Sequence, residues 1–275
     1  MRSLESILGV HSGKVVDKWS SYIDAYESWL SPFKERPVRI LEIGIQNGGS
    51  LEIWNEYFPN AELIIGCDIL KSCGKLTYAA DKIQVVVGDA NSSEAIAQIT
   101  NLSPTFDIII DDGSHTSSDI VKSFSHYFGL LKPDGIYIAE DLHCSYWESF
   151  QGGLRHPMSS MSFFKKLVDL TNFEHWGTDE PGVTFLSKFQ TEYGVQFSEA
   201  ELRKILSIEF RNSLCKIVKT SGADTTLGRR IVVGQEATVW PGALESAGHP
   251  PLAFDQRKNP WSAHEDIGNA EVPAK

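Results

Sequence analysis

The chain has 275 residues, of which 41% are hydrophobic and 22% charged, so it can bury the core of one large domain or of a domain with extensions. Thirty-six acidic residues against 25 basic ones give a formal net charge of −11. This balance argues against nucleic acid and against an anionic membrane surface as partners, because both select a basic face.

The N-terminal segment shows no targeting signal. It lacks the apolar stretch and the small-residue cleavage site of a signal peptide, and no uninterrupted apolar run reaches the length of a membrane span. The four cysteines lack CxxC spacing, so we expect buried thiols and a cytoplasmic location. Residues 17–30 then place Tyr22, Tyr26, Trp29 and Leu30 at helical spacing, which predicts a helix with an aromatic core-facing stripe.

Five short apolar runs follow, rich in isoleucine and valine and with little alternation, as is typical of parallel strands covered on both faces. The runs are residues 38–44, 62–70, 83–89, 106–112 and 134–141. Helical patterns lie between them at 50–58 and 117–131, the second ending at the turn sequence KPDG. The alternation predicts an α/β fold with a doubly wound, mostly parallel Rossmann-like sheet.

Beyond residue 150 the pattern is looser. Helices are expected at 162–170 and 198–207, and strands at 183–189 and 214–220, as antiparallel additions to the sheet edge. From residue 221 the chain is rich in Gly, Pro and Ala, and only GRRIVVG resembles a strand.

This organisation predicts three parts. They are an N-terminal helical extension over residues 1–36, a ligand-binding α/β domain over 37–220 and a partly irregular C-terminal extension over 221–275.

All five predicted strands end in acid. The residues concerned are Glu42, Asp68, Asp89, the pair Asp111 and Asp112, and the pair Glu140 and Asp141. Ligands of open parallel sheets bind beyond the carboxyl ends of the strands. Because carboxylates gathered there repel one another, this edge favours a ligand with positive charge.

The glycine loop GIQNGGS, residues 44–50, is neither a dinucleotide fingerprint nor a P-loop, and no basic residue in it could meet a phosphate. Asp68 could accept both hydroxyls of a ribose, and Asp89 could bind the edge of a base. A nucleoside without phosphates but with a positive centre, such as S-adenosylmethionine, fits this pattern. The simpler alternative is that Gly44 and Gly48 only make a tight turn and that Asp68 caps a helix.

The sequence resembles class I S-adenosylmethionine-dependent methyltransferases, and specifically the metal-dependent sugar O-methyltransferases of the macrocin and mycinamicin type. LEIGIQNGGSLEIW, IIIDDGSH and LLKPDGIYIAEDLHCSYW carry the resemblance, with looser support from DKWSSYIDAYE, and it covers residues 15 to about 235. Where the family has a Gly-Thr-type stretch after Asp-Lys, this chain has Trp19-Ser20-Ser21, so acceptor contacts of that region are not carried over.

The resemblance implies methyl transfer to a hydroxyl of a sugar or glycosylated natural product, by a homo-oligomer. The residues predicted to bind the cofactor are Glu42, Gly44, Gly48, Ser50, Asp68, Asp89 and Asp111.

Neighbouring strand tips should bring Asp112, Glu140 and Asp141 together, because paired strands lie roughly 5 Å apart. Neither DDGSH nor EDLHCSYW contains a basic residue, so either one acid stays protonated or a cation binds. Three carboxylates suit Mg²⁺, and the equivalent positions of the resembled family hold magnesium.

His115, three residues past Asp112, is the predicted general base for an acceptor hydroxyl that the metal activates. The resemblance implies the same role. His143 is predicted to be a second base, a substrate contact or a support for its loop. The alternative for His115 is a solvated histidine beside a plain Asp-Gly-Ser turn.

Other functions use the same residues. Asp112, His115 and His143 could form a two-histidine, one-carboxylate site for iron(II) in a hydroxylase-like enzyme of this fold. The chain could instead be a non-catalytic S-adenosylmethionine-binding subunit, or it could methylate a phenolic or catechol acceptor.

Overall fold

The computed structural model of the protein describes residues 2–222, 224–250, 254–256 and 259–262. They separate into two compact units, one within Met1–Thr171 and Gly182–Thr225 and the other within Asn172–Pro181 and Thr226–Lys275. Among these described residues, no helix combines the length and the apolar character that crossing a membrane requires.

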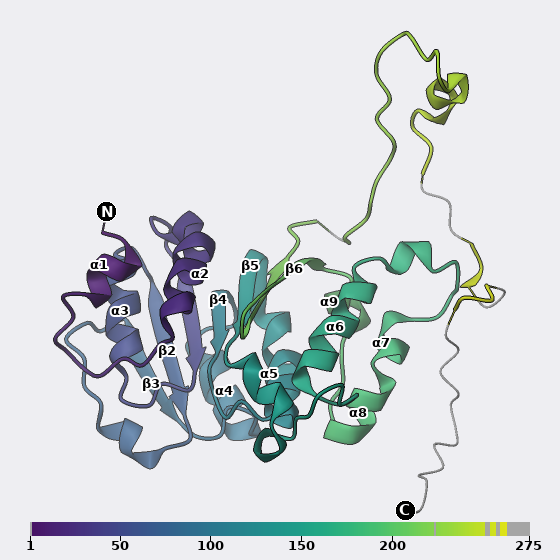
Figure 1. Ribbon diagram of the computed structural model, residues 1–275. Helices are drawn as coiled ribbons and strands as arrows, with labels where there is room; N and C mark the ends of the chain where they lie inside the picture. Colours follow the sequence, from purple (N-terminus) through teal and green to yellow (C-terminus); the bar gives the residue numbers. More distant parts are fainter. Residues whose placement is uncertain (1, 223, 251–253, 257–258, 263–275) are drawn as a thin grey trace, which may run out of the picture. The chain divides into compact units, whose positions relative to one another are not determined.

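The first unit is built on a seven-stranded sheet of order β3-β2-β1-β4-β5-β7-β6 (Figure 1). The strands are β1 (Arg39–Ile43), β2 (Leu63–Asp68), β3 (Ile83–Val87), β4 (Phe106–Asp111), β5 (Leu131–Ala139), β6 (Ile205–Arg211) and β7 (Leu214–Lys219). Strands β1 to β5 are parallel, whereas β7 runs antiparallel to β5 and to β6. The predicted fold class, a mostly parallel sheet with an antiparallel edge, is confirmed.

Helices surround this sheet. They are α1 (Leu4–Leu8), α2 (Ser20–Leu30), α3 (Gly49–Tyr57), α4 (Ser93–Leu102), α5 (Ser117–Tyr127), α6 (Ser160–Leu170), α7 (Gly182–Phe185), α8 (Ser187–Tyr193) and α9 (Glu199–Leu202). Helices α2 and α3 pack through the rings of Tyr26 and Trp54, 5.3 Å apart, and α5 and α6 through those of Phe124 and Phe163, also 5.3 Å apart. The four cysteines are buried free thiols, as predicted.

The chain order of the strands reverses at β1. From β1 the chain continues to β2 on one side, and it returns after β3 to place β4 on the other side. In register, Ile43 lies beside Asp111 and Asp111 beside Ala139, so the residues that follow β1, β4 and β5 lie next to one another. Such a switch point is where open α/β sheets bind ligands.

Several predictions beyond β4 are wrong in detail. Residues 183–189 fall in α7, in the turn at Leu186 and in α8 rather than in a strand, and Leu186 and Phe189 are both buried. The helix expected at 198–207 ends at Leu202, where the pairing of β6 with β7 takes over.

Two turn and strand predictions also fail. KPDG lies inside β5, with Asp134 at φ +61° and a register shift against β4. In the second unit, residues 228–234 form no regular strand, and Ile231 and Val233 are exposed. No neighbouring strand among the described residues pairs with this segment in a ladder.

Candidate active site

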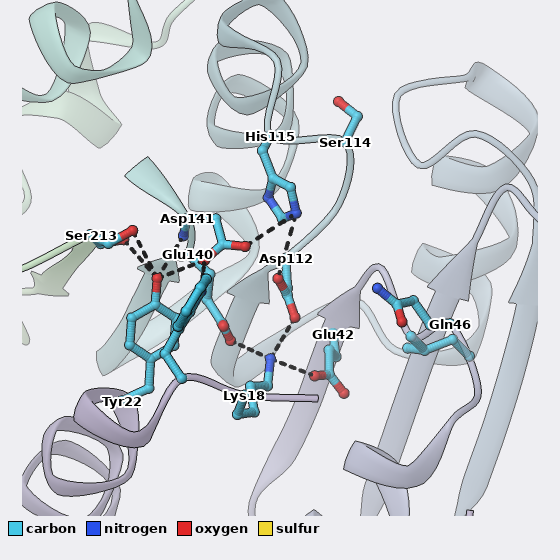
Figure 2. A network of polar contacts seen from close by, with 12 residues as sticks. Lys18, Tyr22, Glu42, Gln46, Asp112, Ser114, His115, Glu140, Asp141 and Ser213 are labelled. Carbon is cyan, nitrogen blue, oxygen red and sulfur yellow. Dashed lines mark hydrogen bonds and ion pairs between the residues drawn. The ribbon is translucent and has the colours of Figure 1, made fainter. Parts of the chain in front are cut away.

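Acidic side chains gather beyond the carboxyl ends of β4 and β5 (Figure 2). Asp112 directly follows β4, and Glu140 and Asp141 follow β5, so the parallel pairing of the two strands brings these residues to one edge. His115 and Asp141 adopt left-handed backbone conformations, with φ of +57° and +54°. A side-chain-bearing residue in this conformation costs roughly 1–3 kcal/mol, and such residues concentrate at functional sites.

A cation from the protein itself lies among these carboxylates. The Lys18 Nζ is 2.5 Å from Asp112 Oδ2, 2.6 Å from Glu140 Oε1 and 3.8 Å from Glu42 Oε1, and the side chain is 9% exposed. Sequence reasoning weighed only protonation or a bound ion, because neither acidic motif contains a basic residue. The ammonium comes from the segment before α2, 94 residues from Asp112 in sequence.

The same N-terminal segment contacts the other carboxylates. The Tyr22 hydroxyl donates to Asp141 Oδ1 at 2.7 Å, and Trp19 Nε1 donates to the same oxygen at 3.1 Å. The Tyr26 hydroxyl donates to Glu140 Oε1. The rings of Tyr22 and Tyr26 are buried as predicted, but their hydroxyls reach the site, which helical spacing alone could not reveal.

His115 faces the second oxygens of two of these acids. Its Nε2 lies 3.5 Å from Asp141 Oδ2 and 3.9 Å from Asp112 Oδ1. One ligand atom of each of the three residues lies within 4.8 Å of the others, and this group does not include Glu140. Two carboxylates and an imidazole at this spacing can hold a metal ion.

Burial determines the protonation of the site. It raises the pKa of Glu140 to about 7 and that of Asp112 to about 6, although Lys18 opposes both shifts. Burial alone would lower the pKa of Lys18, but the Glu140 and Asp112 carboxylates raise it above its usual range. Burial lowers the pKa of His115, more strongly than Asp141 raises it, which favours the neutral imidazole.

Two buried polar atoms near the site have no hydrogen-bond partner among the described residues, His115 Nδ1 and Glu42 Oε1. The other oxygen of Glu42 accepts from Ser50 Oγ at 2.7 Å and from Trp54 Nε1 at 3.1 Å. Buried polar atoms are nearly always paired, so these two are available to a ligand.

At two glycines of the loop after β1, neighbouring atoms approach so closely that a Cβ would not fit. Gly44 has φ +84°, and a Cβ there would lie 2.0 Å from the carbonyl oxygen of Asp112. Gly48 has φ +75°, and its Cβ would lie 2.1 Å from the Tyr78 hydroxyl. Gly44 therefore lets the tips of β1 and β4 meet at the switch point of the sheet.

Asp68 holds the glycine loop in the structure. Its Oδ2 accepts from the backbone N–H groups of Ile45 and Gln46 at 2.9 and 2.8 Å, and its Oδ1 accepts from that of Leu70 at 2.8 Å. These contacts fix the loop after β1 and do not cap a helix, because the helical turn Lys71–Lys75 begins at Leu70 without a side-chain cap. The role of Asp68 toward a ribose stays a prediction.

The remaining predicted cofactor residues lie apart from the cluster around Lys18. Asp89 is exposed, and its Oδ1 accepts from the N–H of Asn91 at 2.9 Å. Asp111 is buried and accepts from the Tyr137 hydroxyl at 2.9 Å, and burial raises its pKa to about 7.

His143 lies at the rim of the site. Its Nδ1 is 2.6 Å from Ser213 Oγ and 3.9 Å from Asp141 Oδ1, and its ring packs 4.8 Å from that of Trp147. Ser213, in the turn between β6 and β7, also has its Oγ 2.8 Å from the Tyr22 hydroxyl. Only the antiparallel hairpin brings this serine here, so no motif could have identified it.

We expect Asp68→Asn to lower the free energy of unfolding by about 2 kcal/mol, because hydrogen bonds to a charged group typically contribute roughly 1.5–3 kcal/mol and the amide keeps only one acceptor oxygen. Chemical denaturation measures the change. Asp89→Asn is the matched control, since its exposed carboxylate accepts a backbone hydrogen bond from Asn91, and should change stability by less than about 0.5 kcal/mol. Equal losses in both variants would contradict the assignment.

No protein-family model matches the chain. Among characterised proteins it is 35% identical over 178 residues to the 8-demethyl-8-α-L-rhamnosyl tetracenomycin-C 2′-O-methyltransferase of Streptomyces olivaceus, covering 61% of this chain and 46% of the relative. It is 32% identical over 165 residues to the mycinamicin VI 2″-O-methyltransferase of Micromonospora griseorubida, covering 56% and 40%. It is 34% identical over 165 residues to the demethylmacrocin O-methyltransferase of Streptomyces fradiae, covering 55% and 41%. The matches span less than half the length of each relative.

Solved structures of the MycE methyltransferase from the mycinamycin biosynthetic pathway share the fold. The complex with Mg, SAH and mycinamycin VI has a TM-score of 0.65 at 24% identity and covers 80% of this chain and 54% of that one. A second crystal form with Mg and SAH gives 0.63 at 23% identity, covering 84% and 55%. The predicted resemblance to methyltransferases of this type is confirmed in sequence and in fold.

Proposed function

We propose that this chain, which has the class I methyltransferase fold, transfers a methyl group from S-adenosylmethionine to a hydroxyl of a sugar or glycosylated natural product with the help of Mg²⁺. One observation carries the proposal: Asp112 and Asp141 converge beyond the carboxyl ends of β4 and β5, and His115 faces both, at the edge of the sheet where ligands bind. The relatives support it, because their names describe O-methylation of glycosylated compounds.

The chain offers a fitting place for the cofactor. Glu42 Oε1 is a buried acceptor without a hydrogen-bond partner among the described residues, and the Gly44 turn admits no side chain. The residues that would hold S-adenosylmethionine are Glu42, Gly44, Gly48, Ser50, Asp68, Asp89 and Asp111. Ser50 would act by fixing Glu42, to which it donates a hydrogen bond. Acidic residues here suit a ligand with a positive centre.

The acidic cluster also fits a hard divalent ion. Asp112, Glu140 and Asp141 would hold Mg²⁺, since each has one oxygen engaged by the N-terminal segment and a second one that none of those donors takes. Asp112 and Asp141 are closest to the required spacing. When bound, S-adenosylmethionine supplies a sulfonium methyl group, and Mg²⁺ supplies a Lewis acid for the acceptor oxygen.

His115 would take the proton of the acceptor hydroxyl. Its Nε2 faces the gap between Asp112 and Asp141, and burial favours the neutral form that a base requires. Figure 2 shows the His115 ring directed at Asp112 and Asp141. His143, fixed by Ser213, would support the Asp141 loop or contact the acceptor.

An iron(II) hydroxylase would need His143 beside His115. The metal-sized group among the described residues contains Asp112, His115 and Asp141 but not His143, whose Nδ1 is bonded to Ser213. This placement favours the magnesium enzyme.

We expect the protein to convert S-adenosylmethionine to S-adenosylhomocysteine in the presence of a glycoside with a free sugar hydroxyl, such as an L-rhamnosyl compound. The reaction should stop when EDTA removes divalent ions. Mg²⁺ should restore the reaction, because the acceptor oxygen needs a Lewis acid. Chromatography of both products measures the rate, and a phenolic acceptor run in parallel tests the competing substrate class. Restoration by Fe²⁺ alone, or cofactor binding without transfer to any acceptor, would overturn the proposal.

A further inference from the structure

Negative charge exceeds positive charge in the buried acidic cluster. Four carboxyl groups belong to it, and the ammonium of Lys18 is the cation that contacts three of them, Glu42, Asp112 and Glu140. The fourth, Asp141, is held by neutral donors from Tyr22 and Trp19. One ammonium balances one ionised carboxylate, so each further carboxylate that ionises adds uncompensated charge, which is costly in a poorly solvated site.

Asp112 is shared between two cation positions. Its Oδ2 contacts Lys18 Nζ at 2.5 Å, while its Oδ1 faces His115 and the side of the cluster that Asp141 Oδ2 also lines. Figure 2 shows this arrangement, with Lys18 on one side of Asp112 and His115 on the other. The inner position is thus filled by the protein, and the outer one has the spacing of a metal site.

We infer that Lys18 is a resident counter-ion that holds the acidic cluster together before a divalent ion arrives and that limits how tightly the ion binds. The inference rests on the metal site of the proposed function. Lys18 is a positioning residue here, since it contacts the carboxylates and not the reacting atoms. Its buried ammonium keeps Asp112 and Glu140 in place, as a protein-supplied cation in a cluster that would otherwise repel itself.

Two opposing effects decide the sign of the test. Losing a residue that orients metal ligands typically weakens metal affinity about 10–100-fold. Removing a positive charge next to a divalent ion strengthens metal affinity, because the two cations repel each other. In a poorly solvated site we expect this repulsion to be the larger of the two effects. The net expectation is tighter binding of the ion together with a less stable metal-free protein.

The experiment compares the full chain with Lys18→Met, using Mn²⁺ alone as the probe, by calorimetric titration and by thermal unfolding with and without the ion. Lys18→Met should bind Mn²⁺ at least about tenfold more tightly than the wild type. Without Mn²⁺ it should melt at a lower temperature than the wild type, and adding Mn²⁺ should raise its melting temperature by more. Lys14→Met is the matched control. Lys14 lies on the same N-terminal segment as Lys18 but pairs with Glu52 of α3, outside the cluster, so this variant should behave as the wild type.

Lys18→Arg keeps the charge and should bind Mn²⁺ within about threefold of the wild type. A Lys18→Met chain that folds only with Mn²⁺ supports the inference, because the ion then replaces the ammonium. Affinity for Mn²⁺ that is unchanged or weaker in Lys18→Met overturns it, as does a chain that stays unfolded in saturating Mn²⁺. These outcomes leave the proposed function intact. If the wild type binds no Mn²⁺, however, the metal site of the proposed function is wrong, and the inference about Lys18 fails with it.

Discussion

Replacing His115 with alanine is expected to lower the rate of methyl transfer by about 10²–10⁴-fold, the usual contribution of a general base, while binding of S-adenosylmethionine is retained. The Nε2 of His115 lies between Asp112 and Asp141, and no other imidazole among the described residues shares that position. Single-turnover rates measure the chemical step, and equilibrium titration measures the affinity for S-adenosylmethionine.

Two further variants make this test specific. His115→Gln keeps a polar side chain but has no basic nitrogen, so it should lose activity as alanine does. His249→Ala removes an exposed histidine that is not among the residues of the proposed site, and it serves as the matched control. If His115→Ala turns over nearly as fast as the wild type, His115 is not the general base, and the alternative of a solvated loop histidine holds.

Gly44→Ala is expected to destabilise the protein by about 2–5 kcal/mol, the sum of a left-handed backbone penalty and of overpacking. The added Cβ would lie 2.0 Å from the carbonyl oxygen of Asp112 and 2.6 Å from its carbonyl carbon, which are backbone atoms that a rotamer change cannot move. The loop after β1 or the backbone at Asp112 must therefore shift, and Mn²⁺ affinity should fall together with stability. Denaturant unfolding and metal titration give the two values.

Gly194→Ala separates the two contributions. Gly194 also has a left-handed backbone, with φ +64°, but nothing lies within 4 Å of the Cβ it would gain. This variant should lose only the conformational contribution, about 1–2 kcal/mol, and should bind Mn²⁺ normally. If Gly44→Ala loses no more stability than Gly194→Ala, then Gly44 is not needed for the close approach of the β1 and β4 tips.

The chemistry of the ligand edge could be predicted from local patterns. Ile- and Val-rich runs without alternation identified β1, β2 and β4 as buried parallel strands, and the topology of such sheets places their carboxyl ends at one edge. That reasoning predicted that Asp112, Glu140, Asp141 and His115 lie at one edge of the sheet, and their role as a site stays a prediction. The region 183–207 was less predictable, because short amphipathic stretches there are compatible with helix and strand, and pairing between β6 and β7 decides.

The sequence by itself determined the order of the five parallel strands and the acidic residues at their ends, since both follow from periodicity and from the rules of parallel sheets. Only the tertiary structure decided what neutralises those acids. Lys18, Tyr22 and Ser213 lie in segments far from the acidic motifs in sequence, and their contacts with the cluster are long-range. Periodicity reports which face of an element is buried, but not which distant polar atom reaches the same point, because that depends on how whole elements pack.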